Sequence, residues 1–327
     1  MLEFLRKTDG YVSGQVMSND LRLSRVAVWK HIKTLQAQGC RIKTCQHRGY
    51  RLTSAPDLPT EEAIASMLHT QALGRPLLFF REVDSTNRQL AKFAVEAAEG
   101  LTLVADHQTA GRGRMGRAWF SPSGVNVHLS VLLRPSVSLS QVPSLPLVVG
   151  CVVARAMEKF VAQAPIKLKW PNDLLINGRK ISGILCEMTA ETDGVQYVIV
   201  GIGLNVNLTS HRMPQDMQQT ATSIRIESGR HVSRADVVAE ILNQLEPAYR
   251  LWCAEGLAPF LPQIAALDLL KGNVTRVEQA GRQAVVEGIA DGVGADGTLL
   301  LRQPDGSHLS VCSGDAHIVP VIPPAAE

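Results

Sequence analysis

The chain has 327 residues, of which 45% are hydrophobic and 19% charged, with 26 glycines and 17 prolines. This composition excludes a disordered or collagen-like chain, and the length predicts two or three domains. Residues 1–7 mix acidic and basic side chains, and no apolar run is long enough for a signal peptide or a membrane span. The six cysteines lack zinc or disulfide spacing, so we expect a cytoplasmic protein with reduced thiols and no metal site.

Charge is distributed unevenly along the chain. Residues 1–53 hold ten Lys and Arg against three Asp and Glu, whereas residues 54–327 hold 23 against 27. A basic module is thus joined to a mildly acidic body. This asymmetry indicates a polyanionic partner for the first module, although composition alone also fits a solvated basic face without a partner.

The basic module begins with two predicted helices joined by a tight turn. The first covers residues 14–21, and the second covers residues 25–38, with Ser24 as its N-cap and Gly39 as its end. The second helix has one buried stripe, made by Val28, Ile32 and Leu35. Two helices in this arrangement are typical of a helix-turn-helix.

A predicted hairpin follows, with strands over residues 41–45 and 50–52 and a basic turn between them. A recognition helix beside such a wing is typical of DNA-binding proteins, and the alternative is a winged helix used for protein contacts. For DNA binding we expect contacts from the exposed side of the helix and from the wing, by Ser24, Arg25, Val26, Trp29, Lys30, Lys33 and Arg48.

The body starts near residue 60, after a linker that contains two prolines. Its predicted helices cover residues 88–98, 141–161 and 234–254, the last with Pro247, which should kink or divide it. The predicted strands cover residues 77–80, 101–106, 125–133, 166–170, 174–176, 179–181, 184–188 and 195–204. Asn177-Gly178 predicts a type I′ hairpin turn, and the order of elements predicts an α+β domain with a mixed or mainly antiparallel sheet.

From Gly272 onward only short strands and turn signals remain. We therefore expect a small all-β barrel or sandwich at the C-terminal end. The predicted domains are a winged helix-turn-helix at residues 1–53, a ligand-binding α+β domain at residues 60–270, and a small β-barrel at residues 271–321.

A loop at residues 111–117 reads GRGRMGR and satisfies the pattern GxGxxG. A dinucleotide site would need a helix directly afterwards, but Pro122 and Gly124 stand where that helix should run, and no Gly-Lys-Ser/Thr supports a P-loop. Three glycines interleaved with three arginines instead predict a mobile loop that closes over an anionic ligand. The alternative is a basic surface turn without a ligand.

Three further motifs place polar or small residues at turns and strand ends. They are DSTN at residues 84–87, KWPND at residues 169–173 with Lys180 on the following hairpin, and GIGLN at residues 201–205. Taken alone, DSTN would also fit an ordinary helix N-cap. Together with the arginine loop, these motifs offer cations and N–H donors for an anionic ligand.

In this order the motifs DSTN, Q-x-x-GRGRxGRxW, KWPND with a following Lys, and GxGxN are similar to those of the biotin–protein ligases. With the winged helix, the chain resembles the bifunctional biotin ligases and biotin-operon repressors of bacteria. The resemblance implies activation of biotin by ATP and Mg²⁺ to biotinyl-5′-adenylate, followed by transfer to a lysine of the biotin carboxyl carrier protein of acetyl-CoA carboxylase. It also implies a homodimer that binds operator DNA and represses biotin synthesis genes, with the adenylate as corepressor.

Carried over by position, the resemblance implies three groups of site residues. The catalytic residues would be Lys180, Asp173 and Arg114. Biotin would be bound by Ser85, Thr86, Asn87, Gln108, Arg112, Gly113, Arg114 and Lys180. The adenylate would be bound by Gly111, Arg117, Trp119, Asn172, Gly183 and Asn205.

Two other functions compete with this interpretation. A lipoate or octanoate ligase also handles an acyl-adenylate, but the small polar side chains of Ser85, Thr86 and Asn87 favour the ureido ring of biotin over a dithiolane. A repressor without catalysis would not need Lys180, Asp173 and all the loop arginines.

Overall fold

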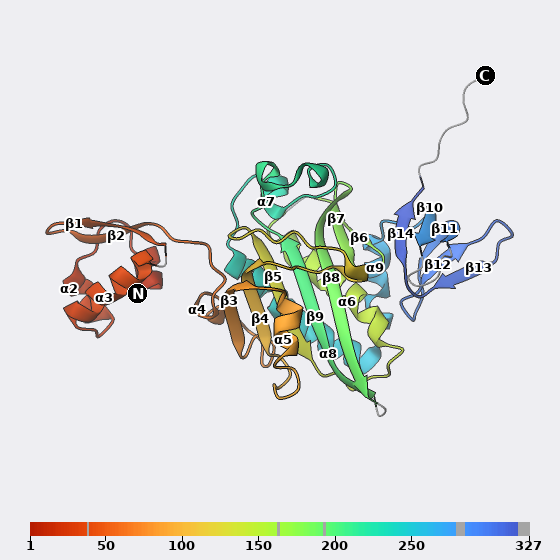
Figure 1. The fold of residues 1–327 in the computed structure, drawn as a ribbon, viewed down its shortest axis with the longest axis horizontal. Helices are drawn as coiled ribbons and strands as arrows, with labels where there is room; N and C mark the ends of the chain where they lie inside the picture. Colours follow the sequence, from red (N-terminus) through yellow and green to blue (C-terminus); the bar gives the residue numbers. More distant parts are fainter. Residues whose placement is uncertain (38, 162–163, 192–193, 279–284, 320–327) are drawn as a thin grey trace, which may run out of the picture. The chain divides into compact units, whose positions relative to one another are not determined.

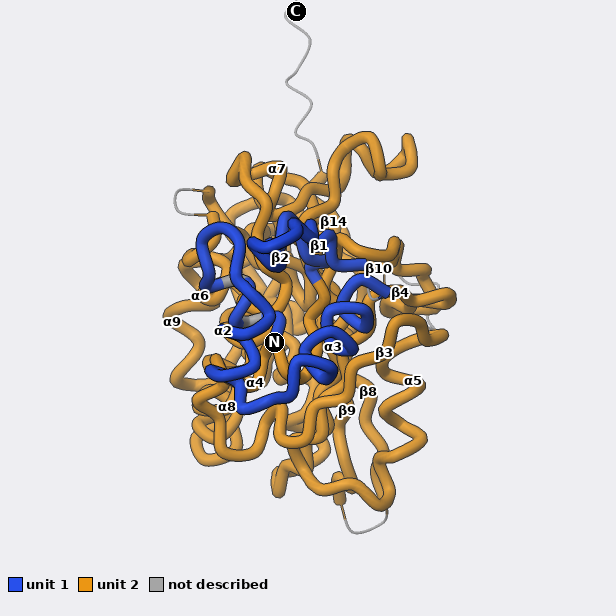
Figure 2. The backbone as a smooth tube through the Cα atoms, turned by 90° about the vertical axis from the view of Figure 1, so that its left-hand side faces the viewer, with its two compact units in different colours: residues 1–57 blue, residues 58–327 orange. Residues whose placement is uncertain are grey.

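A computed structural model describes the chain except residues 38, 162–163, 192–193, 279–284 and 320–327 (Figure 1). The chain forms two compact units, Met1–Asp57 and Leu58–Glu327 (Figure 2). No helix in the described part is long and apolar enough to cross a lipid bilayer. Residue 38, the predicted end of a helix, and residues 320–321, the predicted end of the last domain, lie outside the described residues.

The first unit is the predicted winged helix-turn-helix. Its turn contains Arg22 in the left-handed region, with φ of 51°, where glycine is common. Ser24 accepts a hydrogen bond from the Ala27 amide at 3.1 Å, which confirms the predicted N-cap. The elements are α1 (Leu2–Lys7), which the sequence analysis did not predict, α2 (Gly14–Asp20), α3 (Arg25–Ala37), β1 (Arg41–Cys45) and β2 (Gly49–Ser54).

The second unit is built on a seven-stranded mixed sheet with the order β3-β4-β5-β9-β8-β7-β6. Strands β3 and β4 are parallel, and the other neighbours are antiparallel, as predicted. The strands are β3 (Leu77–Val83), β4 (Thr102–Gln108), β5 (Asn126–Leu133), β6 (Ile166–Lys169), β7 (Asp173–Ile176), β8 (Arg179–Glu191) and β9 (Gly194–Asn205). The helices are α4 (Glu61–Ala65), α5 (Thr86–Ala91), α6 (Leu145–Glu158), α7 (Ile224–Ser228), α8 (Arg234–Glu255) and α9 (Leu261–Leu267).

The inner strand β5 is buried on both faces because helices lie on either side of the sheet (Figure 1). Its residues Val127, Leu129 and Val131 join the large core with α6 and α8. The alternate residue Leu132 packs against Leu90 of α5 in a smaller core. Side chains alternate along a strand, so Asn126, His128 and Ser130 lie on the same face of β5 as Leu132, which is the α5 side of the sheet.

Three predicted elements differ from the structure. Helix α5 begins and ends earlier than predicted, because residues beyond Ala91 continue as turns with i→i+3 hydrogen bonds. The two strands predicted at 179–181 and 184–188 form one long strand, β8. Helix α8 is continuous through Pro247, so this proline does not divide the helix, which was one of the two predicted effects.

The C-terminal segment forms a separate five-stranded antiparallel sheet with the order β13-β12-β11-β10-β14. Its buried residues belong to the same large core as those of the seven-stranded sheet. Trp170 strengthens this connection by donating a hydrogen bond to the Gly297 carbonyl at 3.0 Å. The strands are β10 (Val274–Glu278), β11 (Val285–Val293), β12 (Leu299–Arg302), β13 (His308–Val311) and β14 (Asp315–Ile318).

Candidate active site

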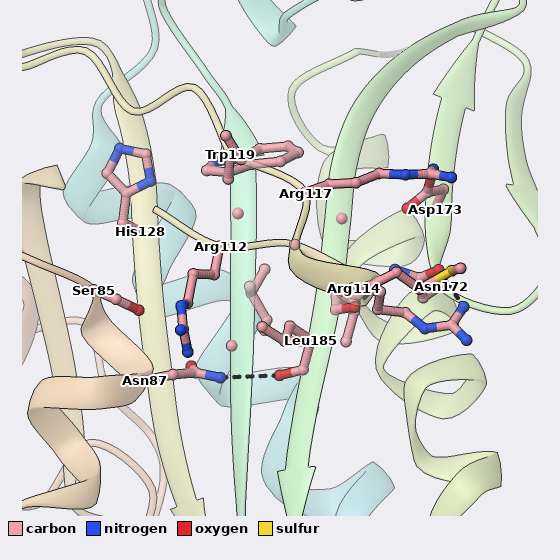
Figure 3. A pocket seen from close by; sticks show the side chains of 18 of the residues that line it. Ser85, Asn87, Arg112, Arg114, Arg117, Trp119, His128, Asn172, Asp173 and Leu185 are labelled. Carbon is pink, nitrogen blue, oxygen red and sulfur yellow. Dashed lines mark hydrogen bonds between the residues drawn. The ribbon is translucent and has the colours of Figure 1, made fainter. Parts of the chain in front are cut away.

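A pocket of about 130 Å³ lies on the α5 side of the seven-stranded sheet (Figure 3). It brings together the segments that carry the predicted motifs, although they are far apart in the sequence. Of the predicted site residues, those that line it are Ser85, Thr86, Asn87, Gln108, Arg112, Gly113, Arg114, Arg117, Trp119, Asn172, Asp173, Lys180 and Gly183.

One end of the pocket is organised around Asn87, in the first turn of α5. Its side-chain nitrogen donates to the Leu185 carbonyl at 3.3 Å (Figure 3). The same nitrogen donates to Glu187 at 2.7 Å, and the side-chain oxygen accepts from Ser130 at 2.6 Å. Gly201 makes this position possible, since a Cβ there would lie 2.4 Å from the Asn87 oxygen. The amide of Asn87 is therefore held in one orientation.

Gln108 fixes the neighbouring polar residues. Its side-chain oxygen accepts from the Thr86 amide at 2.8 Å and from the Thr86 hydroxyl at 3.1 Å, while its nitrogen donates to Ser121 at 3.0 Å. Ser85 stands at the N-cap position of α5, but its side chain makes no capping hydrogen bond. The Ser85 hydroxyl therefore does not act as an ordinary helix N-cap, which was the alternative interpretation of this motif.

The arginine loop, residues 111–117, folds back on itself over the pocket. Within it, the Gly113 amide donates to the Arg117 carbonyl at 2.7 Å, and a short 3₁₀ turn carries Met115 at a φ of 55°. Arg114 donates to Asn172 at 3.2 Å and to the Gly314 carbonyl at 3.4 Å.

Asp315, at the start of β14, supplies a counter-charge to this loop. It forms an ion pair with Arg117 and lies 3.8 Å from Lys169. Burial alone would raise the pKa of Asp315, but the Arg117 hydrogen bond and the Lys169 charge hold it below its usual range. The carboxylate is therefore ionised at neutral pH and can compete with an anionic ligand for the arginine.

Lys180 and Asp173 meet across the β7–β8 hairpin, where they form an ion pair of 2.7 Å. The turn between these strands has positive φ at both Asn177 and Gly178, which confirms the predicted type I′ geometry. The Lys180 ammonium also lies 5.5 Å from the centroid of the Trp119 ring. An ion-paired ammonium group is thus held beside an aromatic ring at the pocket wall.

A second cavity of about 160 Å³ adjoins the first and shares Trp119 and Lys180 with it. Asn205 lines this second cavity, where its side chain accepts from Asn126 and donates to the Thr222 carbonyl, both at 3.0 Å. Asn205 is therefore not among the residues that line the main pocket. Gly111 does not line the main pocket either, and a Cβ at this position would lie 2.6 Å from the Trp119 carbonyl.

Sequence reasoning missed several residues of the main pocket, among them His128, Leu185, Gly314 and Asp315. His128 is buried on β5, where burial and the charge of Arg234 lower its pKa to about 3. Behind it, Arg234 is fully buried and pairs with Asp106 at 2.8 Å. The local sequence around these residues does not indicate a pocket, because they come from strands and loops that are far apart in the chain and meet only in the fold.

The expected DNA-contacting residues, which are Ser24, Arg25, Val26, Trp29, Lys30, Lys33 and Arg48, are all exposed in the first unit. Val26 is 64% and Trp29 52% exposed, although both are large apolar side chains. The Lys33 ammonium lies 5.9 Å from the Trp29 ring. Cationic and apolar groups therefore share the exposed face of α3.

Comparison with known proteins agrees with both units. A family model described as "Biotin/lipoate A/B protein ligase family" matches residues 79–205, and one described as "HTH domain" matches residues 1–51. The "Bifunctional ligase/repressor BirA" of Bacillus subtilis is 37% identical over 304 residues, covering 93% of each chain. The protein of that name from Escherichia coli is 32% identical and covers 89% of this chain and 88% of its own.

Among solved structures, the biotin protein ligase from Aquifex aeolicus in complex with biotin and ATP is similar, with a TM-score of 0.64 and 31% identity. The match covers 74% of this chain and 98% of that one. The chain therefore belongs to the family of the bifunctional ligase/repressors, with a central segment of the biotin/lipoate protein ligase type.

Proposed function

We propose that this protein is an ATP-dependent biotin–protein ligase that also represses transcription by binding DNA. It forms biotinyl-5′-adenylate from biotin and ATP and then transfers biotin to a lysine of a carrier protein. The observation that carries this proposal is the pocket, which combines the oriented amide of Asn87, the arginine loop and the Lys180–Asp173 pair. Ligase relatives and a biotin- and ATP-bound neighbour support it.

We assign the two ends of the pocket to the two substrates. Ser85, Thr86, Asn87 and Gln108 would bind the ureido ring of biotin, because their hydroxyl and amide groups can donate to and accept from a urea. Their mutual hydrogen bonds support this role by fixing the orientation of Thr86 and Asn87 before the substrate arrives. Arg112 and Gly113, at the start of the loop, would close over the biotin tail.

The nucleotide would occupy the other end, beside Trp119. The second cavity, which Trp119 and Asn205 line, has room for a flat base against the indole. Gly183 supports this arrangement, since a Cβ there would approach the Trp119 ring at 3.3 Å. Gly111 and Arg117 would act from the loop, and Asn172 would orient Arg114, with which it shares a hydrogen bond.

Lys180, Arg114 and Asp173 would support the chemistry. Attack of the biotin carboxylate on the α-phosphate of ATP concentrates negative charge, which Lys180 and Arg114 would neutralise in the transition state. Asp173 would hold the Lys180 ammonium in place until ATP arrives. The described residues contain no group of three or more His, Cys, Asp or Glu that could hold a metal ion, so we expect Mg²⁺ to arrive bound to ATP.

We propose that the first unit binds operator DNA through α3 and the wing, with the seven exposed residues named above as contacts. A single winged helix contacts one half-site, so a homodimer would be needed for a two-fold symmetric operator. Pairing would belong to the second unit, through an edge of its sheet, and biotinyl-adenylate would strengthen it. By linkage, the adenylate would then also strengthen DNA binding. We assign these functions to domains at residues 1–53, 60–270 and 271–321, and place the protein in the cytoplasm.

Mass spectrometry of a purified biotin carboxyl carrier domain would test the ligase. Incubation with this protein, biotin and ATP should add one biotin to one lysine, whereas lipoate in place of biotin should add nothing. Lys180→Ala should abolish most of the modification. Lys159→Ala is the matched control, because Lys159 is exposed, pairs with Glu240 at 2.8 Å and lies outside the pocket. Modification by lipoate alone would identify the rival ligase.

Footprinting and sedimentation would test the repressor. Biotin plus ATP should tighten both dimerisation and operator binding by the full chain, while a chain without residues 1–57 should activate biotin but not bind the operator. Operator affinity that is indifferent to both substrates would reduce the first unit to an unregulated DNA-binding appendage.

A further inference from the structure

His128 lies at the midpoint of the polar row on β5. On the same face of this strand, Ser130 bonds to Asn87 at 2.6 Å and Asn126 bonds to Asn205 at 3.0 Å. Residues two apart on a strand are separated by about 7 Å. His128 therefore stands between the end of the pocket assigned to biotin and the cavity assigned to the nucleotide.

The neighbours of His128 leave space in front of its ring. Its partners on the adjacent strands are small: Ala105 of β4 has only a methyl group, and Gly203 of β9 has no side chain. The Trp119 indole covers Gly203, so His128 and Trp119 line the same part of the pocket. Figure 3 shows the imidazole on β5 beside the indole.

Three buried nitrogens at this position lack a partner. His128 is 1% exposed, and neither of its ring nitrogens has a hydrogen-bond partner among the described residues; the same is true of the Trp119 indole nitrogen. A neutral imidazole carries one donor and one acceptor, and leaving them unpaired in a buried site costs free energy. Because both residues line a pocket, a bound ligand can supply the missing partners.

The surroundings of His128 keep its ring uncharged. Arg234 of α8 and Asp106 of β4 face it as an ion pair of 2.8 Å, and His107 of β4 is the other titratable neighbour. Protonation would place a second buried cation next to Arg234, whose charge Asp106 already neutralises. The ring can therefore donate a hydrogen bond without adding charge to the site.

We propose that His128 is a substrate-binding residue that donates a hydrogen bond to an oxygen at the junction of the carboxyl and phosphoryl groups in biotinyl-5′-adenylate. This inference rests on the proposed function. A neutral donor at the junction fixes the position of the oxygen while Lys180 and Arg114 supply the positive charge. The second ring nitrogen is left to accept a hydrogen bond from a hydroxyl group or water.

The affinity of purified full-length variants for biotinyl-5′-adenylate tests the proposal. His128→Phe keeps a ring but loses both nitrogens, and it should weaken binding about tenfold, since it leaves a buried ligand oxygen unpaired. His128→Asn and His128→Gln restore a side-chain N–H, and one of them should recover part of the loss. His107→Phe is the matched control, because His107 pairs with Glu82 at 3.0 Å and does not line the pocket.

Binding of biotin alone distinguishes the two sources of the oxygen. An equal loss of biotin affinity in His128→Phe identifies the carboxyl oxygen, and unchanged biotin affinity with weakened adenylate binding identifies a phosphoryl oxygen. Both results support a contact at the junction. Adenylate affinity within about twofold of wild type in a folded His128→Phe protein overturns the proposal, as a neutral hydrogen bond is worth more than that.

Nitrogen-15 NMR of the histidine rings provides a readout on the wild-type protein itself. In the wild-type protein, the ring nitrogen signals of His128, assigned by their absence from a His128→Asn spectrum, should shift when biotin and ATP are added. Signals that stay unchanged at saturating adenylate would also overturn the proposal. Failure of the ligase assay on carrier protein, by contrast, would refute the proposed function and not this contact alone.

Discussion

Substitution of Gly203 by alanine should disable the ligase while leaving the protein folded. The backbone at Gly203 permits a side chain, but its Cβ would lie 2.5 Å from Cε2 and 2.7 Å from Nε1 of Trp119. Carbon atoms in ordinary contact are about 3.5–4.0 Å apart, so the indole must retreat by about 1 Å. Trp119 lines both cavities, and a shift of that size at a reacting site costs on the order of 10²-fold in rate.

The fold should tolerate this change better than the activity does. Overpacking costs about 1–3 kcal/mol, and alanine recovers about 0.5–1 kcal/mol in a strand because it is less flexible than glycine. We therefore expect a loss of about 1 kcal/mol in the free energy of unfolding, measured in urea, against about a hundredfold loss in single-turnover pyrophosphate release. Gly183→Ala, whose Cβ would approach Trp119 at 3.3 Å, should show a smaller loss of activity.

A double-mutant cycle identifies the cause. In a Trp119→Ala background the clash no longer exists, so Gly203→Ala should cost little further activity. An equal loss in both backgrounds would refute the steric explanation and would place the effect in the strand itself.

Four further predictions concern charge and the loop. Lys180→Ala should slow adenylate formation by about two orders of magnitude or more, with less effect on biotin binding, and unchanged pyrophosphate release in single turnovers would contradict the role of this lysine. Protease nicking near Arg114 should slow sharply when biotin and ATP are added, and equal rates would argue against loop closure. Arg234→Met leaves Asp106 buried without its cation and should lower the free energy of unfolding by about 3–5 kcal/mol in urea titrations. Burial raises the pKa of Asp106, but the Ser123 hydrogen bond and Arg234 lower it overall. The ionised carboxylate therefore stabilises the fold above its unfolded pKa of about 4, and this contribution is lost as the pH falls below that value. In Asp106→Asn the free energy of unfolding should depend less on pH in this acidic range.

The parts of the site that follow from local geometry could be predicted from the sequence. Asn177-Gly178 fixes a tight hairpin, and this hairpin brings Asp173 and Lys180 within 2.7 Å of each other. Ser24 indicated the start of the recognition helix in the same way, through one side-chain hydrogen bond. In both cases the residues that determine the local structure lie within a few positions of the element they shape.

The residues that the sequence analysis missed depend on contacts between distant segments. His128 stands in an apolar strand, and nothing in the neighbouring letters distinguishes a core histidine from one that lines a pocket. Asp315, on the five-stranded sheet, pairs with Arg117 of the arginine loop, 198 residues away. Asn205 differs from these two residues, since its motif was recognised in the sequence and its side chain lines the adjoining cavity. Pro247 failed as a helix breaker because the packing of α8 overrides its local preference.

The order of the pocket residues along the chain has a consequence for biosynthesis. A ribosome adds residues from the N-terminus, and the compact unit of residues 1–57 emerges before any residue of the pocket. The carboxylate of Asp315, which pairs with Arg117 of the arginine loop, emerges after every other pocket residue. During translation the basic unit can therefore fold early, whereas the nascent chain has no finished substrate pocket until β14 has left the ribosome. Substrate binding can stabilise the ligase unit only after that point, so a stalled or truncated chain would carry a folded basic unit and an incomplete pocket.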